Sequence, residues 1–213
     1  MATDTRKKYV VEHMEDGFYP WVLLEYQAIS ADVGGSGQFF LTSLKPELAS
    51  SLPEALSRPG IVTTTTEEVI ALAGVSESAK QGRVCLLDPA AEVDLSPADA
   101  EQFDWFVFGG ILGDHPPRDR TGELRRYGFT GRRLGDKQMT TDTAIRVTQI
   151  IAEKRVALDE IPFVDFPELR FSKHSSTEMP FRYVRDEQGE PIMPKGMKEL
   201  IKEDSKRGIE DLL

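Results

Sequence analysis

Two short apolar runs constrain the fold more than any other feature of the sequence. Residues 84–87 are followed by Asp88-Pro89, and residues 105–108 by Gly109-Gly110. A strand with one face in solvent alternates apolar and polar residues, whereas a parallel strand covered by helices on both faces is apolar throughout. We therefore predict two buried parallel strands and an α/β fold rather than an antiparallel sandwich.

The residues before these runs predict a β-α-β unit. Residues 9–11 are β-prone, Pro20 suits the first turn of a helix, and three glycines between residues 34 and 37 end that helix before a strand at 39–44. The later predicted elements are a strand near 61–64, a short helix near 67–73, a helix over 141–154, a strand-and-loop extension over 161–194 and a charged amphipathic helix over 197–213. This order predicts a mostly parallel sheet with helices on both faces.

The composition is that of one soluble domain. With 213 residues, of which 39% are hydrophobic, the chain is long enough for one full core. No apolar stretch approaches the roughly 18 residues that span a bilayer, and residues 1–8 are polar. We predict a cytoplasmic protein with a flexible N-terminus over 1–8 and no membrane partner. The lone Cys85 lies in an apolar run and is predicted to be a buried hydrophobic residue.

The charge balance favours a basic partner. The chain has 26 basic and 36 acidic residues, a net charge of −10, and such a field repels a polyanion such as RNA.

A glycine-rich turn follows the second buried strand. The run is Phe108-Gly109-Gly110-Ile111-Leu112-Gly113-Asp114. Glycines at the carboxyl end of a strand let the backbone approach a ligand closely, and ligands of open α/β sheets bind at this edge. A simple tight turn is the alternative.

A second polar loop, residues 133–141, leads into the predicted helix over 141–154. Thr140 or Thr141 can cap this helix, and a capped helix start exposes N–H groups that suit a carboxylate or ribose hydroxyls. The Gly-x-Gly-x-x-Gly fingerprint follows none of the predicted strands, so an ordinary dinucleotide fold has little support. We predict a ligand pocket built from 108–114 and 133–141.

Together these loops resemble those of the SPOUT methyltransferase superfamily, whose cofactor loops form a trefoil knot. The motifs that carry the resemblance are Gly109-Gly110-Ile111-Leu112-Gly113, Arg133-Leu134-Gly135 and Thr140-Thr141-Asp142-Thr143-Ala144. Longer blocks at 12–15, 82–89, 108–121, 134–146 and 178–184 resemble the eukaryotic branch, fungal members included, that methylates an arginine of the small-subunit ribosomal protein S-three. The similarity runs from about residue 9 to residue 213, and only about 31–81 departs noticeably.

The resemblance implies a knotted methyltransferase domain over 9–160, an extension over 161–213 packed on it, and action as a monomer rather than as a knot-mediated dimer. It implies S-adenosylmethionine (SAM) as cofactor, with adenine near 134–139 and the ribose and methionine parts near Leu87, Asp88 and 109–113. The implied cofactor-binding residues are Leu87, Asp88, Phe108, Gly109, Gly110, Ile111, Gly113, Leu134, Gly135, Lys137, Gln138, Met139, Thr140 and Thr141. No histidines have metal-ligand spacing, and we predict no metal.

An arginine acceptor needs carboxylates, because its guanidinium stays charged and is oriented by forked hydrogen bonds. An acidic tip, residues 12–16, follows the first predicted strand on the same sheet edge as the glycine turn. We predict Glu12, Glu15 and Asp114 as arginine-orienting groups and His13 as a proton acceptor. The alternatives are that the acids stabilise the next helix N-terminus and that the histidine forms a structural hydrogen bond.

The leading hypothesis is therefore a SAM-dependent protein-arginine N-methyltransferase that adds one methyl group to the basic protein S-three. One rival is a SPOUT RNA methyltransferase, for which six arginines would contact phosphate: Arg118, Arg120, Arg125, Arg126, Arg132 and Arg133. Pairing of Arg118 and Arg120 with Asp114 and Asp119 to brace the knot is the favoured alternative, given the net charge, so direct RNA binding is not favoured. The second rival is a non-catalytic, cofactor-binding ribosome assembly factor.

Overall fold

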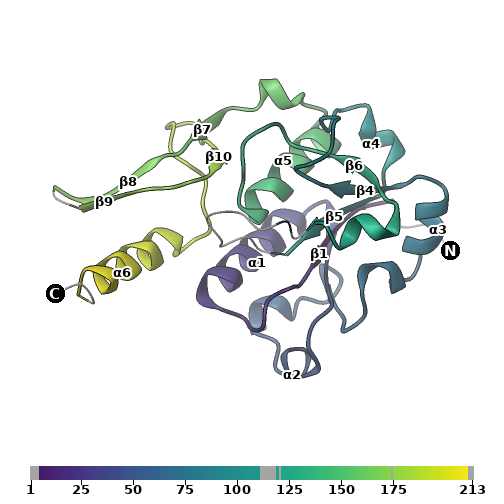
Figure 1. Ribbon diagram of the computed structural model, residues 1–213, viewed down its shortest axis with the longest axis horizontal. Coiled ribbons are helices and arrows are strands. Elements are labelled where there is room, and N and C mark those ends of the chain that lie inside the picture. The colour runs from purple at the N-terminus through teal and green to yellow at the C-terminus, as the bar shows by residue number, and fades with distance from the viewer. Residues whose placement is uncertain (1–4, 111–118, 120, 174, 211–213) are drawn as a thin grey trace.

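Six parallel strands form the sheet around which the chain packs (Figure 1). The computed structural model describes residues 5–110, 119, 121–173 and 175–210. The strands are β1 (Lys7–Glu12), β2 (Gly37–Thr42), β3 (Val62–Thr64), β4 (Val84–Leu87), β5 (Trp105–Gly109) and β6 (Thr130–Arg132), in the order β3-β2-β1-β5-β4-β6. Because the chain adds β2 and β3 on one side of β1 and places β5 and β4 on the other, the strand order reverses at β1.

Alternate residues of the central strands pack into two cores, one on each face of the sheet. On one face Tyr9, Phe106 and Phe108 pack with the long helices α1 (Pro20–Val33) and α5 (Thr141–Lys154). On the other face the strands are covered by short elements, chiefly the 3-10 turn η2 (Val69–Ala71), α3 (Val75–Lys80) and the 3-10 turn η3 (Leu124–Tyr127). The remaining short elements are α2 (Pro46–Ala49), η1 (Glu54–Leu56), α4 (Asp99–Gln102) and η4 (Leu158–Glu160). The predicted parallel sheet with helices on both faces is confirmed.

The element predictions are accurate where periodicity or an apolar run is strong. The strand over 84–87 and the helix over 141–154 have the predicted bounds, and β1 begins two residues before the predicted start. The predicted helix near 67–73 is wrong, because its Val69 N–H bonds to the carboxylate of Glu12 and only a single 3-10 turn forms. A left-handed Gly74, with φ of 89°, then precedes α3.

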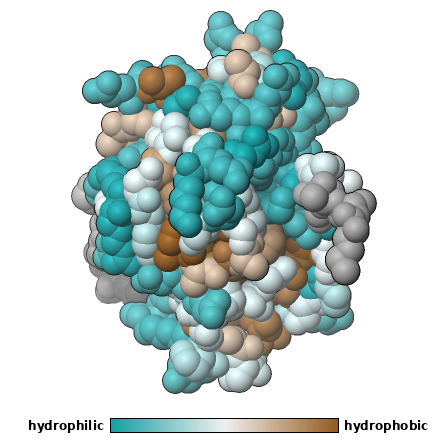
Figure 2. Space-filling view, turned by 90° about the vertical axis from the view of Figure 1, so that its right-hand side faces the viewer, coloured by the Kyte–Doolittle hydropathy of each residue, from teal (hydrophilic) through white to brown (hydrophobic). Residues whose placement is uncertain are grey.

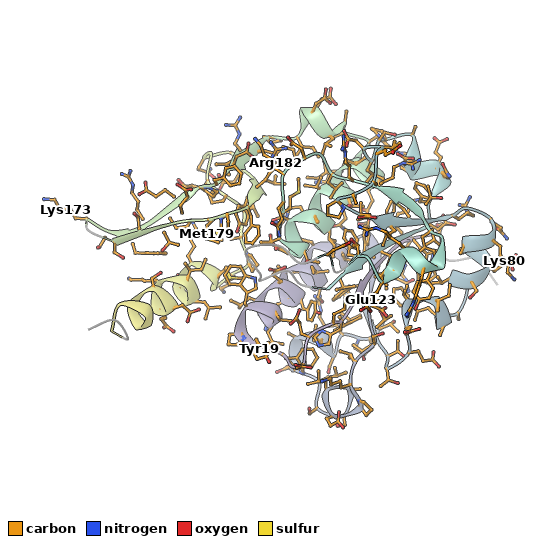
Figure 3. All side chains as sticks on the ribbon, in the orientation of Figure 1. Tyr19, Lys80, Glu123, Lys173, Met179 and Arg182 are labelled. Atoms are coloured by element: carbon orange, nitrogen blue, oxygen red, sulfur yellow. The ribbon has the colours of Figure 1, made fainter. Side chains whose placement is uncertain are left out.

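The C-terminal extension packs on α1. In it β7 (Phe163–Asp165) pairs with β10 (Arg182–Val184), and β8 (Glu168–Ser172) pairs with β9 (Ser175–Glu178). A third core joins these strands to α6 (Met197–Glu210), and Trp21 and Leu24 of α1 pack against it. The β8–β9 hairpin and α6 project side by side from the body, with Lys173 at the hairpin tip (Figures 1 and 3).

The end of the molecule near α3 presents apolar side chains in the middle of a largely hydrophilic surface (Figure 2). Within the described part of the chain, the helices are too short or too polar to cross a bilayer. Cys85 is buried, as predicted. The loop 111–118, which contains part of the predicted knot, lies outside the described residues, and the trefoil knot stays a prediction.

A buried carboxylate joins three segments on the second face of the sheet. Glu12, the last residue of β1, is 5% exposed. Its Oε2 accepts hydrogen bonds from the hydroxyl of Thr42 and, at 3.0 Å, from the N–H of Val69, and its Oε1 accepts one from the hydroxyl of Ser43 at 2.5 Å. The side chain therefore fastens β2 and η2 to the end of β1.

We expect Glu12→Gln to lower the free energy of unfolding by about 1–3 kcal/mol, because an amide NH2 cannot accept the hydrogen bonds that one carboxylate oxygen accepts. Urea unfolding followed by circular dichroism measures the effect. Glu47→Gln, on the exposed side of α2, is the matched control and is expected to leave stability unchanged. Equal stability of both variants and the wild type would contradict the structural role of Glu12.

Candidate functional site

The described residues enclose a cavity of about 440 Å³ at the carboxyl ends of β4 and β5. It is lined by the segments 87–90, 108–109 and 133–139 together with Asp119, Thr121, Arg125, Thr141 and Ala144. The cavity lies beside the point where the strand order reverses, which is the usual ligand position in an open α/β sheet. Its volume is in the range of about 300–1,000 Å³ typical of small-molecule sites.

One wall of the cavity is formed by a loop, residues 134–138, that lies between β6 and α5. Gly135 has a φ of 82°, a left-handed conformation that favours glycine and turns the chain around the cavity. The N–H groups of 134–138 donate to no oxygen of the described residues. The side-chain Nε2 of Gln138 is also buried without a hydrogen-bond partner among them. This wall can therefore donate several hydrogen bonds to a ligand.

The C-terminal extension holds the loop 134–138 in place through hydrogen bonds. The N–H of Arg182 donates to the carbonyl of Gln138 at 2.8 Å. Asp165 on β7 accepts from the Nε of Arg182 at 2.6 Å and from the Nζ of Lys137 at 2.5 Å. The hydrogen bond from Arg182, joined by that from Lys137, lowers the pKa of Asp165 to about 2. The ionised Asp165 therefore ties the cavity loop to the extension.

A buried carboxylate from α1 caps α5. The Oε2 of Glu25, which is fully buried, accepts a hydrogen bond from the N–H of Asp142 at 3.2 Å, and its Oε1 accepts one from the indole of Trp21 at 2.6 Å. Thr140 occupies the N-cap position, but its hydroxyl bonds to that of Thr143. The prediction that a threonine side chain caps this helix is therefore wrong, because Glu25 performs this role from another helix.

Thr141 joins the two predicted loops. Its hydroxyl donates to the carbonyl of Gly110 at 3.1 Å, so the start of α5 is bonded to the chain that leaves β5. Since Thr141 also lines the cavity, the capped helix and the glycine turn meet at the cavity floor.

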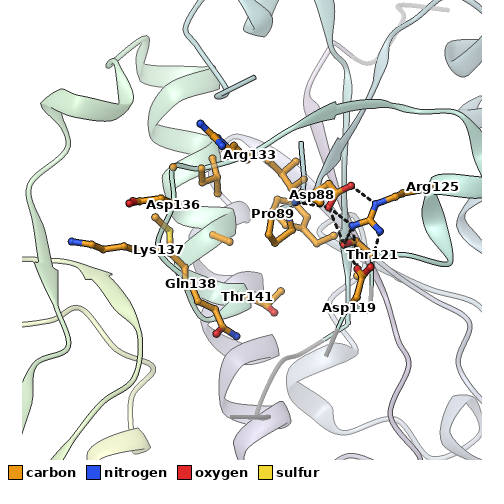
Figure 4. A pocket seen from close by; sticks show the side chains of 18 residues that line it. Asp88, Pro89, Asp119, Thr121, Arg125, Arg133, Asp136, Lys137, Gln138 and Thr141 are labelled. Atoms are coloured by element: carbon orange, nitrogen blue, oxygen red, sulfur yellow. Dashed lines mark hydrogen bonds and ion pairs between the residues drawn. The ribbon is translucent and has the colours of Figure 1, made fainter. Parts of the chain in front are cut away.

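A charged cluster forms the facing wall (Figure 4). The guanidinium of Arg125 donates from Nε and NH2 to the two oxygens of Asp88, at 2.6 and 2.7 Å, and from NH1 to Asp119 at 2.6 Å. Thr121 donates to both carboxylates. The hydrogen bonds from Arg125 hold the pKa values of Asp88 and Asp119 below their usual range. All four residues line the cavity.

The sequence of this chain matches a known family over nearly its whole length. The model of the family described as "Protein arginine N-methyltransferase SFM1-like" matches residues 8–208. The chain belongs to this family. The curated yeast protein "Protein arginine N-methyltransferase SFM1", from Saccharomyces cerevisiae, is 51% identical over 215 residues, which cover 97% of this chain and 99% of the relative.

Solved structures agree with membership of the SFM1-like family. The crystal structure of the yeast arginine methyltransferase SFM1 complexed with SAM is 53% identical, with a TM-score of 0.84 over 94% of this chain and 92% of that chain. The crystal structure of yeast SFM1 complexed with SAH is also 53% identical, with a TM-score of 0.82 over 91% of this chain and 94% of that chain. The dual specific Trm10 from Thermococcus kodakaraensis, 18% identical with a TM-score of 0.53 over 72% of this chain and 96% of that one, shares the fold alone. The predicted family is confirmed.

Within this SFM1-like chain, the cavity brings together most of the residues predicted to bind cofactor. Ten of them line it: Leu87, Asp88, Phe108, Gly109, Leu134, Gly135, Lys137, Gln138, Met139 and Thr141. Gly110 and Thr140 adjoin the lining, whereas Ile111 and Gly113 lie outside the described residues. Sequence reasoning missed Asp119, Thr121 and Arg125 as lining residues, since only the fold brings these three side chains together beside Asp88 at the end of β4. Their binding roles stay predictions.

The three described residues among those predicted to act on arginine, Glu12, His13 and Glu15, do not line the cavity. The carboxylate of Glu12 is buried and accepts hydrogen bonds from Thr42, Ser43 and Val69. The Nδ1 of the buried His13 lies 2.8 Å from the hydroxyl of Tyr26, which agrees with the alternative that this histidine forms a structural hydrogen bond. Glu15 is half-buried, and Asp114 lies outside the described residues. The catalytic roles of these four residues stay predictions, and the inward contacts of Glu12 and His13 do not favour theirs.

Glu25 provides a test through pH. Burial raises the pKa of Glu25 well above its usual range, and the neighbouring Asp142 raises it further. The folded state therefore holds this proton more tightly than the unfolded chain, whose glutamate pKa is about 4.3, so stability is lost as the pH rises from there towards the raised pKa.

We expect the wild type to lose stability relative to Glu25→Gln between about pH 5 and about pH 8, because the glutamate has to release a proton that the folded state holds tightly and a neutral amide has none to release. Urea unfolding of both proteins at the two pH values measures this difference. Glu101→Gln, on an exposed position of α4, serves as control. Parallel pH profiles for the wild type and Glu25→Gln would contradict the raised pKa.

Proposed function

We propose that this protein transfers one methyl group from SAM to an arginine of a basic small-subunit ribosomal protein, S-three. The observation that carries the proposal is the cavity at the ends of β4 and β5, in a chain whose SFM1 relatives were solved in complex with SAM, SAH and MTA. Membership of a family of protein arginine methyltransferases supports the acceptor class.

The cavity suits the nucleoside part of SAM. Ring nitrogens and ribose hydroxyls can accept hydrogen bonds from two sets of donors that have no acceptor among the described residues. These are the backbone N–H groups of 134–138 and the side-chain Nε2 of Gln138. Leu87, Leu134 and Met139 supply apolar surface for a flat base. These residues would hold the cofactor, since a ligand at this wall satisfies donors that the described residues leave unmet.

Bound SAM supplies a methyl group on a positively charged sulfur, which a nucleophile displaces in line. The protein must therefore hold the acceptor nitrogen against that methyl group and keep water away. The guanidinium has a pKa above about 12 and has to be oriented while it loses a proton, a task for carboxylates. Because Glu12 pairs in register with Gly109, the acidic tip begins beside the carboxyl end of β5, and Glu15 is the half-buried carboxylate of that tip.

Charge pairing supports a protein acceptor over RNA. Of the six arginines considered for phosphate contacts, Arg118 and Arg120, with their predicted pairing, lie outside the described residues. The four described ones form ion pairs: Arg125 with Asp88 and Asp119, Arg126 with Glu68, Arg132 with Asp99 and Arg133 with Asp94. A phosphate would have to displace these carboxylates. The net charge of −10 also attracts a basic protein at long range.

The test is methyl transfer from labelled SAM to separated small-subunit proteins and ribosomal RNA. We expect label in S-three alone, and mass spectrometry of its peptides should find one added methyl group on an arginine. Label confined to RNA would establish the rival RNA methyltransferase, and SAM binding without label in any fraction would establish the non-catalytic assembly factor.

Ala144→Phe should reduce transfer by about 100-fold or more, because the ring occupies the cavity that Ala144 lines and displaces the ligand. Ala31→Phe, at an exposed position of α1, is the matched control and should retain wild-type transfer. Circular dichroism confirms that both variants fold. Full transfer by Ala144→Phe would show that the cofactor binds elsewhere.

A further inference from the structure

Three aromatic rings surround the start of the acidic tip that follows β1. His13, the first residue after β1, is buried. The centroid of its ring lies 5.4 Å from that of Phe18 and 5.9 Å from that of Tyr26, and the rings of Phe18 and Tyr26 meet edge to face at 6.4 Å. Because His13 and Phe18 stand at the two ends of the segment 13–18, their contact closes this segment into a loop.

Tyr26 orients the histidine through a hydrogen bond. Its hydroxyl lies 2.8 Å from the Nδ1 of His13, and both side chains are buried. Whichever of the two atoms donates, the bond fixes the direction of the imidazole, because a buried ring nitrogen and a buried hydroxyl both require a partner. Tyr26 is itself held by the core, since it belongs to α1 and its ring packs 6.0 Å from that of Phe39 on β2. The phenol therefore links the start of the tip to the packing of α1 on the sheet.

Two further contacts attach the tip to the body. The N–H of His13 donates to the carbonyl of Thr42 at 3.0 Å, which fixes the main chain where the tip begins. Further along, Asp16 pairs with Lys45 at 2.6 Å, but both side chains are exposed. An exposed ion pair holds a loop weakly, because water screens the charges and two flexible side chains have to be ordered. The buried hydrogen bond of Tyr26 is therefore the stronger of these two side-chain constraints.

The orientation of the tip matters because of where the tip begins. Glu12 lies opposite Gly109, which lines the cavity, and the N–H of Gly110 donates to the carbonyl of Glu12 at 2.9 Å. The half-buried Glu15 lies within the loop 13–18. A guanidinium is oriented by forked hydrogen bonds to a carboxylate, and a misplacement of about 1 Å can cost about 100-fold in rate. A constraint on this loop is thus a constraint on a carboxylate that could orient an arginine.

We propose that Tyr26 is a positioning residue for methyl transfer: through His13 it holds the acidic tip in the orientation in which the tip receives the acceptor arginine. This inference rests on the proposed function and concerns the acceptor side of the reaction. Tyr26 does not line the cavity, so its hydroxyl acts through the histidine and not on the reacting atoms. His13 then serves as an anchor, in agreement with its buried hydrogen bond.

The test is the steady-state kinetics of Tyr26→Phe, which removes the hydroxyl and keeps the ring. With labelled SAM and S-three as acceptor, we expect kcat to fall by about tenfold to 100-fold, because the bound arginine is no longer held in line with the methyl group. The KM for S-three and the Kd for SAH, measured by isothermal titration, should stay within about threefold of the wild type, since the lost interaction acts in the transition state.

Tyr9→Phe is the matched control for the loss of a buried hydroxyl. Tyr9 is also fully buried, and its hydroxyl donates at 2.5 Å to Glu153, near the C-terminal end of α5. Both variants should lose stability in urea, yet Tyr9→Phe should keep the kcat of the wild type. Equal losses of kcat in the two variants would show that Tyr26 serves stability alone, and wild-type kcat in Tyr26→Phe would likewise overturn the role.

His13→Asn, alone and combined with Tyr26→Phe, tests whether the hydroxyl acts through the histidine. We expect each single variant to lower kcat and the double variant to be no slower than the slower single one, because both changes break the same link. Losses of kcat that multiply in the double variant would contradict the link. Absence of methyl transfer from the wild type to S-three would instead overturn the proposed function, and this role with it.

Discussion

A single buried carboxylate on α1 connects the parts from which the cavity is built. Glu25 accepts hydrogen bonds from Trp21 on its own helix and from the first turn of α5, and Thr141 in that turn bonds to the carbonyl of Gly110. Burial favours the protonated form of Glu25, and this neutral carboxyl group accepts both hydrogen bonds. The positions of both cavity loops thus depend on how α1 packs against α5.

The C-terminal extension is connected both to the cavity loop and to α1. Its strand β10 bonds to the carbonyl of Gln138, and Asp165 on β7 holds Lys137, so the cavity loop is bonded to residues far along the chain. The third core in turn packs the extension onto Trp21, whose indole donates to Glu25. A displacement of the extension would therefore reach the cavity both directly, through the loop, and indirectly, through α1.

Local sequence patterns predicted the strands and helices around the site, but not the residues distant in sequence that form hydrogen bonds with it. The apolar run 84–87 and the periodic helix 141–154 were predictable because each is set by its own residues. Glu25 meets α5 across 117 residues and Arg125 meets Asp88 across 37, and only the folded sheet brings such residues together. The inward contacts of Glu12 could not be predicted for the same reason, since an acidic residue after a strand gives no sign that Thr42, Ser43 and Val69 donate hydrogen bonds to it.

Strand pairing also determines how the acidic tip after β1 lies relative to the end of β5. Glu12 lies opposite Gly109, and the N–H of Gly110 donates to the carbonyl of Glu12 at 2.9 Å, so the tip begins beside the end of β5. Within the tip, Glu12 is committed to the interior and Asp16 to Lys45 at the surface, at 2.6 Å. Glu15, the third carboxylate of the tip, is half-buried. Because β1 and β5 are adjacent, an acceptor site at the acidic tip, as proposed, would lie near the ends of β4 and β5, where the cavity is found.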